Sequence, residues 1–185
     1  LQTHDQVGNR AKGDRLSLLV DLDAMAGAAA LLLSLPYTPM PFMGEAWGAQ
    51  TPWQFFTSFP DPDLGAAVTA GRRPEFSANG WATSDVPDPQ DRHTFEDSKL
   101  SWEQTAVEPH ARLHQWYRTL LHLRKQERGI GSADAAPGAS TAGDIRVSVQ
   151  PHTEGARAEL AVIERPGWLT AVNLSGGEQA VMLPG

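Results

Sequence analysis

Two stretches with apolar patterns predict the long helices of this chain. Residues 24–44 carry no charged side chain. Pro36, Pro39 and Pro41 cannot continue a helix, so we expect one at about 23–35. A helix that is apolar on every side is typical of the interior of a larger protein. The same prolines exclude a membrane span, which needs about 20 uninterrupted apolar residues.

A second helix is predicted at 109–127, where apolar residues recur every three or four positions. Pro109 suits the first turn of a helix, because its missing N–H has no partner there in any case. Arg124 and Lys125 lie near the C-terminal end, where positive charge is favoured. The stripe that should face the core consists of Leu113, Trp116, Tyr117, Leu120 and Leu121.

Residues 44–106 form a long segment without sustained periodicity, in which only 64–70 favours a short helix. A loop of this length in a compact domain is usually functional. The apolar run before it suits a strand. Proline lacks the N–H that a sheet needs, so we expect this strand only at about 40–43.

The last part of the chain predicts β-structure. Apolar and polar side chains alternate there, and Gly-containing pairs mark turns, which indicates a small antiparallel β-domain at 144–185. A stretch rich in Ala, Gly and Ser at 131–143 predicts the linker that precedes it. The expected strands lie at about 144–150, 158–165, 168–174 and 178–183.

Composition narrows the class of protein. A chain of 185 residues suffices for one large domain or two small ones, and 41% hydrophobic with 20% charged residues is typical of a globular protein. The absence of cysteine excludes disulfides and favours a cytoplasmic location. The chain opens at Leu1 in the middle of a polar motif and without a leader-like segment, so we expect a piece of a longer protein.

The net charge of −7 lies entirely in residues 1–106, since acidic and basic residues balance after that point. An acidic surface argues against nucleic acid as a partner and is compatible with a neutral ligand such as a sugar. Paired carboxylates such as Asp61 and Asp63 stand in loop-like sequence, and we interpret them as solvated turns. The histidines show no ligand spacing with carboxylates, so we expect no metal and no cofactor.

The first residues carry the motif that points to a chemistry. Thr3-His4-Asp5-Gln6-Val7-Gly8-Asn9-Arg10 resembles the last sequence signature of the α-amylase family, in which the His-Asp pair ends the seventh strand of a barrel. That family has Asn at the position of Thr3, and Thr lacks its amide donors. The spacing Pro39-x-x-x-x-Gly44-Glu45 resembles the signature of the eighth strand, although Ala46 replaces a second Glu that is common there.

Longer phrases resemble one branch of that family, the malto-oligosyltrehalose trehalohydrolases, and the resemblance runs to about residue 128. It implies an α/β plus all-β fold. The last two βα units of a (β/α)8 TIM barrel would occupy 1–130, with the long loop 44–106 after the last strand, and a small antiparallel β-sandwich domain would follow. The phrases are TPWQFF (51–56), GRRPEF (71–76), PDPQD (87–91) and SKLSW (98–102).

The resemblance also implies an activity: hydrolysis of the α-1,4-glucosidic bond next to the terminal trehalose of maltooligosyl-trehalose, which releases trehalose. Such hydrolysis needs a general acid and a second carboxylate, and in the family both belong to strands that would precede Leu1. By resemblance Asp5 is the third carboxylate, which stabilises the positively charged transition state, and His4 donates a hydrogen bond to the same sugar. We therefore expect the isolated chain to be inactive without the missing N-terminal part of the barrel.

Further substrate contacts are predicted at the start of the long loop, because flat aromatic faces stack on the apolar faces of glucose rings. Packing of the loop is the alternative for each aromatic residue, and we favour it for Trp81 and Trp102. Arg72 and Arg73 are expected to pair with nearby carboxylates. Besides His4, the predicted substrate-binding residues are Glu45, Trp47, Trp53, Phe55 and Phe56.

Two other functions stay open. A glycogen-branching or debranching enzyme of the α-amylase family shares the opening motif but not the loop phrases. A non-catalytic remnant could bind α-1,4-glucan by aromatic stacking without hydrolysing it.

Overall fold

A computed structural model describes residues 1–35, 37–78, 80–82, 86–126, 146–151, 158–165 and 168–181. The chain divides into two compact units. The first comprises Leu1–Leu22 and Pro41–His114, and the second comprises Asp23–Met40 and Gln115–Gly185. None of the helices in the described ranges is long and apolar enough to cross a membrane.

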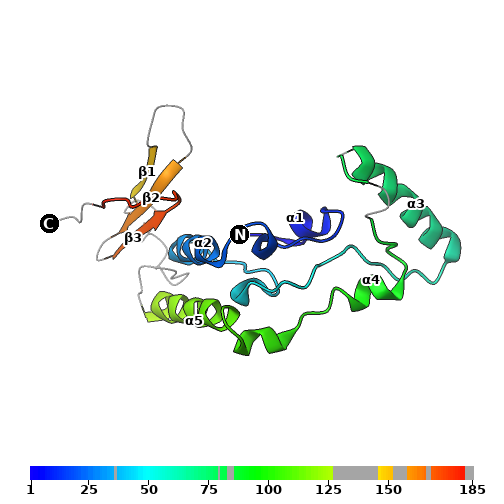
Figure 1. The fold of residues 1–185 in the computed structure, drawn as a ribbon, viewed down its shortest axis with the longest axis horizontal. Coiled ribbons are helices and arrows are strands. Elements are labelled where there is room, and N and C mark those ends of the chain that lie inside the picture. The colour runs from blue at the N-terminus through cyan, green and yellow to red at the C-terminus, as the bar shows by residue number, and fades with distance from the viewer. Residues whose placement is uncertain are drawn as a thin grey trace, which may run out of the picture. The chain divides into compact units, whose positions relative to one another are not determined.

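The first unit consists of short helices joined by extended chain (Figure 1). The helix expected at 64–70 is present and longer than predicted, because it begins at Pro62 and continues through Pro74. The elements of this unit are α1 (His4–Gly8), η1 (Leu16–Leu18), η2 (Glu45–Trp47), α3 (Pro62–Ala78), α4 (Arg92–Glu96) and η4 (Trp102–Ala106).

The first helix, α1, begins where the sequence led us to expect the end of a strand. Thr3 Oγ1 accepts a hydrogen bond from the Asp5 N–H at 3.2 Å, and Gln6 Oε1 accepts one from the Thr3 N–H at 2.7 Å. These reciprocal bonds form a capping box, which satisfies N–H groups that a helix start leaves without partners. His4 and Asp5 are therefore the first two residues of a helix.

The strand predicted at 40–43 was wrong, because these residues adopt no strand in the structure. Pro41 has no N–H to give to a sheet. The Phe42 N–H points instead to Glu45 Oε2 at 3.4 Å, and the Met43 carbonyl accepts a hydrogen bond from Arg15. The backbone groups that a strand would use are thus bound to side chains.

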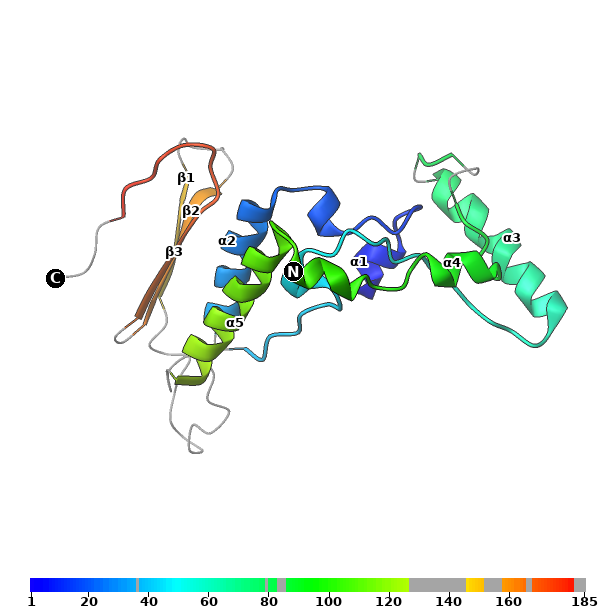
Figure 2. The ribbon, with the colours of Figure 1, turned by 60° about the horizontal axis from the view of Figure 1, so that its bottom comes forward.

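The second unit places two helices beside a sheet (Figures 1 and 2). α2 (Leu22–Ser34) confirms the helix predicted at 23–35, and α5 (His110–Gln126), whose first turn lies in the first unit, confirms the one predicted at 109–127. The sheet is antiparallel in the order β1-β2-β3, and its strands are β1 (Arg146–Pro151), β2 (Ala158–Arg165) and β3 (Trp168–Asn173).

The predicted stripe of α5 is only partly correct. Leu113 and Tyr117 are buried, whereas Trp116 is 38% and Leu121 is 44% exposed. The indole N–H of Trp116 donates to the Ala26 carbonyl of α2 at 2.9 Å, so this ring spans the groove between the two helices. A polar atom on an apolar ring therefore decides how deep Trp116 can lie.

The sandwich predicted for the C-terminal part was wrong within the described residues, which form one three-stranded sheet there. Residues 178–181 belong to no strand, and 182–183 lie outside the described ranges. Three of the expected strands are present, with register pairs such as Val147 with Ile163 and Ile163 with Thr170. The predicted linker at 131–143 also lies outside the described ranges.

Candidate functional site

All seven residues predicted to act on a sugar lie in the first unit. His4 and Asp5 are adjacent and open to solvent, since their side chains are 67% and 74% exposed. His4 Nε2 lies 3.3 Å from Asp5 Oδ1. The start of α1 thus presents a carboxylate and an imidazole together, a combination that can accept and donate hydrogen bonds to hydroxyl groups.

Trp53 is the predicted loop aromatic that lies beside this pair. Its ring makes an edge contact with His4 at 6.4 Å between centroids, and with Phe42 at 5.5 Å and Phe56 at 6.4 Å. It also covers α1 closely, because a Cβ added to Gly8 would lie 2.7 Å from Trp53 Cζ3. His4, Asp5, Trp53 and Phe56 therefore form one cluster, which we call the α1 cluster, in which His4 and Asp5 are exposed and the two aromatic residues are half-buried.

The loop that carries Trp53 is tied to the chain that follows α1. The Trp53 N–H donates to the Gly13 carbonyl at 2.9 Å. Gly13 has a φ of 68°, and a Cβ there would meet the Trp53 carbonyl oxygen at 2.4 Å. A residue without a side chain is thus required at Gly13, both for its backbone conformation and for the close approach of the loop.

Glu45 and Trp47 lie in the interior of the unit. Glu45 is fully buried, with its Oε1 at 3.7 Å from the Leu1 nitrogen and its Oε2 facing the Phe42 N–H. Trp47 packs on Trp102, with centroids 5.0 Å apart, and its carbonyl is bonded to His110 Nδ1 at 2.8 Å. Because both residues are buried, we favour a supporting role for Glu45 and a packing role for Trp47 over contact with a sugar.

Phe55 also contacts protein. The guanidinium carbon of Arg72 lies 4.2 Å from the centroid of its ring. Phe55 is nonetheless 38% exposed, so part of its ring is available to a ligand. The sequence predicts that Arg72 pairs with nearby carboxylates. In the structure its guanidinium bonds to the Gly8 carbonyl and contacts the rings of Phe55 and Phe76.

No separate role was predicted for Arg15, and the structure places it in the interior of the first unit. It is 1% exposed, its Nε donates to the Thr51 carbonyl, and its Nη1 donates to the Met43 carbonyl at 2.6 Å. Burial lowers the pKa of Arg15 to about 10, so the guanidinium keeps its charge at neutral pH. With its carbon 5.3 Å from the Phe42 centroid, it connects both ends of the loop that leads to Trp53.

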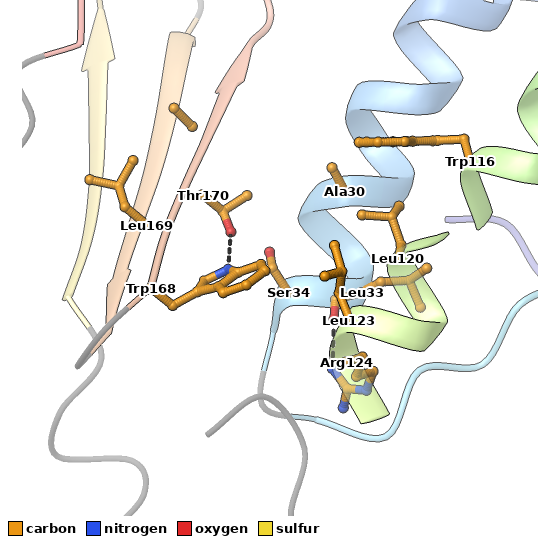
Figure 3. A pocket seen from close by; sticks show the side chains of 11 residues that line it. Ala30, Leu33, Ser34, Trp116, Leu120, Leu123, Arg124, Trp168, Leu169 and Thr170 are labelled. Carbon is orange, nitrogen blue, oxygen red and sulfur yellow. Dashed lines mark hydrogen bonds between the residues drawn. The ribbon is translucent and has the colours of Figure 1, made fainter. Parts of the chain in front are cut away.

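A separate hollow of about 250 Å³ lies in the second unit (Figure 3). Trp168 of β3 points toward Ser34 of α2, and its indole N–H donates to Thr170 Oγ1 at 2.9 Å. Leu33, Leu120 and other apolar side chains form most of the lining. The hollow contains none of the predicted site residues. Over the described ranges, no group of three or more His, Asp or Glu side chains is placed to hold a metal ion.

Comparisons with known proteins relate the chain to one kind of enzyme. No family model matches it. It is 51% identical over 156 residues to the malto-oligosyltrehalose trehalohydrolase of Arthrobacter ramosus, which covers 80% of this chain and 27% of that protein. The enzyme of the same name from Mycobacterium tuberculosis is 54% identical over 128 residues, which cover 69% of this chain and 22% of that protein. The enzyme of that name from Saccharolobus solfataricus is 44% identical over 126 residues, which cover 68% of this chain and 20% of that protein.

A solved structure supports the same grouping. A candidate alpha amylase of Salmonella typhimurium matches 100% of this chain and 30% of its own, with a TM-score of 0.77 and 34% sequence identity. The chain spans between 20 and 27% of the length of the curated relatives that it matches. The chain corresponds in sequence to one part of the malto-oligosyltrehalose trehalohydrolases, and in fold to part of that alpha amylase.

Proposed function

We propose that this chain is the C-terminal part of a glycoside hydrolase of trehalose biosynthesis, which cleaves the α-1,4-glucosidic bond next to the terminal trehalose of maltooligosyl-trehalose. The observation that carries the proposal is the α1 cluster. It presents an exposed Asp and His beside Trp53, in a chain 44 to 54% identical to trehalohydrolases. The curated relatives that match carry that one name, which gives no support to a branching or debranching enzyme.

In the proposed reaction, the bond between the anomeric carbon and the bridging oxygen breaks, the oxygen takes a proton, and water supplies the new hydroxyl. The general acid and the nucleophilic carboxylate would come from the part of the enzyme that precedes this chain. Asp5 would accept hydrogen bonds from sugar hydroxyls. Its negative charge stabilises the positive charge that develops at the anomeric carbon.

His4 and Trp53 would hold the same sugar. The exposed imidazole of His4 can donate a hydrogen bond to one sugar hydroxyl group, next to the hydroxyl groups that donate to Asp5. The indole of Trp53 offers an apolar face beside the pair, which suits the C–H face of a glucose ring. Arg15 and the two interior residues Glu45 and Trp47 would support the loops without touching substrate.

Asp5→Asn in the full-length enzyme tests this assignment. The change keeps the size of the side chain and removes its charge, so kcat for trehalose release should fall by ~10²–10⁴-fold, the scale for losing one preorganised electrostatic contact. His4→Ala should cost less, because it removes one hydrogen bond. Asp97→Asn, an exposed position at the end of α4, is the matched control and should leave kcat unchanged. Normal turnover of Asp5→Asn would refute the proposed site.

A further inference from the structure

We propose that Arg72 is a positioning residue, which fixes α1 from its C-terminal end and thereby sets the place of Asp5. This inference rests on the proposed function, because it assigns Arg72 a role in the chemistry of the α1 cluster. Arg72 lies in α3, 67 positions along the chain from Asp5.

The first support is the set of hydrogen bonds between Arg72 and the end of α1. Arg72 Nη2 donates to the Gly8 carbonyl at 2.5 Å. Nη1 and Nη2 both reach the side-chain oxygen of Asn9, at 3.4 and 3.3 Å. Gly8 is the last residue of α1 and Asn9 is its C-cap. The last carbonyls of a helix have no partner within it, and a cation is favoured there.

The second support is that two aromatic rings hold the guanidinium plane. Its central carbon lies 4.2 Å from the centroid of Phe55 and 4.8 Å from that of Phe76. The cavity that these groups line has a volume of about 10 Å³, which is at the lower limit for a single water. The guanidinium is therefore held by stacking as well as by hydrogen bonds, a geometry that the point charge of Lys does not reproduce.

α3 is also anchored by apolar packing, in addition to the hydrogen bonds of Arg72. Phe76 of α3 is buried together with Ala11 and Val86, and Trp81 packs against the same cluster. This apolar contact brings α3 to the segment that follows α1. Removing the Arg72 side chain should thus leave α3 docked while freeing the end of α1.

A shift at the end of α1 reaches Asp5 because the helix is short. It has five residues, so its length is roughly 7 Å at about 1.5 Å per residue. Its capping box holds the first turn together as one piece. A tilt that moves Gly8 therefore also moves Asp5, and a misplacement of about 1 Å can cost ~10²-fold in rate.

The test compares Arg72→Met, Arg72→Lys and Asp5→Asn with the double variant Arg72→Met/Asp5→Asn, all in the full-length enzyme. Arg72→Met should lower kcat by roughly 10- to 100-fold, with KM changed by less than about threefold. Arg72→Lys should restore little of this loss. In the Asp5→Asn background, Arg72→Met should lower kcat by less than about a further threefold, because the effects of residues that act through one another are not additive.

Arg92→Met is the matched control, since Arg92 is exposed on α4 and bonds to Glu96 in the same helix. It should leave kcat unchanged. Circular dichroism checks that each variant is folded. If Arg72→Met does not fold, Asn9→Ala takes its place in the cycle, because it removes one acceptor and keeps the cation.

The outcomes separate the two proposals. If Arg72→Met lowers kcat by the same factor in the Asp5→Asn background as in the unmodified enzyme, the positioning role is overturned. It is also overturned if Arg72→Lys keeps full turnover. Either result leaves the proposed function intact. Normal turnover of Asp5→Asn alone would overturn the proposed function. A loss that nearly vanishes when Asp5 is already neutral supports both.

Discussion

At the scale of single residues, burial separates the predicted site residues into two kinds. His4 and Asp5 are exposed at the start of α1, whereas Glu45 is buried and holds a turn. Trp53 shares features of both groups, because it packs on Gly8 and also borders the exposed His4. Its position leads to a prediction about binding rather than about chemistry.

Trp53→Ala in the full-length enzyme should raise KM and change kcat little. A stacking contact that is equal in the ground state and the transition state contributes to binding alone. Losing roughly 1–2 kcal/mol of stacking between the sugar and the ring should raise KM by about 5- to 30-fold. Trp102→Ala, at a ring that packs on Trp47 instead, is the comparison. Equal KM values for the two variants would show that Trp53 is a packing residue.

At the scale of elements, Arg124 joins the ends of α2 and α5. Its Nη1 donates to the Leu33 carbonyl at 2.7 Å (Figure 3). Nη1 also donates to the Leu35 carbonyl at 2.6 Å, and Nη2 donates to the Tyr37 carbonyl at 2.7 Å. These carbonyls belong to the end of α2 and the turn after it, where no helical N–H is left to bind them. One cation on α5 thus completes the C-terminal end of a neighbouring helix.

Arg124→Met should lower the free energy of unfolding by about 1–3 kcal/mol, the cost of leaving partly buried carbonyls without a donor. The aliphatic part of the side chain is retained, so the loss reports on the hydrogen bonds. Arg118→Met, at an exposed position of the same helix, should change stability by less than about 0.5 kcal/mol. Urea unfolding followed by tryptophan fluorescence measures both. Equal stabilities would mean that water replaces Arg124 at no cost.

At the scale of the whole molecule, the sheet offers a surface that suits contact with further protein. Among the described residues β1 and β3 are its edges, and on β1 the side chains of Val147 and Val149 are more than half exposed. Unpaired strand edges with apolar side chains favour association. The relatives extend well beyond the region that this chain matches.

The isolated chain should therefore be poorly stable or aggregate, and it should release no trehalose from maltooligosyl-trehalose. Size-exclusion chromatography with light scattering, a thermal melt and a trehalose assay check the three parts. A monodisperse monomer that melts cooperatively above about 60 °C, or one that turns over substrate, would contradict the prediction.

The sequence by itself determined the elements that depend on neighbours along the chain. The apolar run stopped by Pro36 located α2, and the stripe with Pro109 before it located α5. Alternation located three strands to within two residues at each end. The motif that opens the chain led us to predict His4 and Asp5 by its resemblance to the α-amylase family, and the structure places their side chains side by side.

Only the tertiary structure decided what surrounds that pair. Arg15 binds the Thr51 carbonyl 36 positions away, and Arg72 binds the Gly8 carbonyl 64 positions away. No periodicity along the chain reports such contacts. The same holds for Glu45, whose burial depends on which segments fold over it. Local patterns fix where helices and strands form, whereas the partner of a buried charge is set by the path of the whole chain, because burial removes the water that would otherwise bind it.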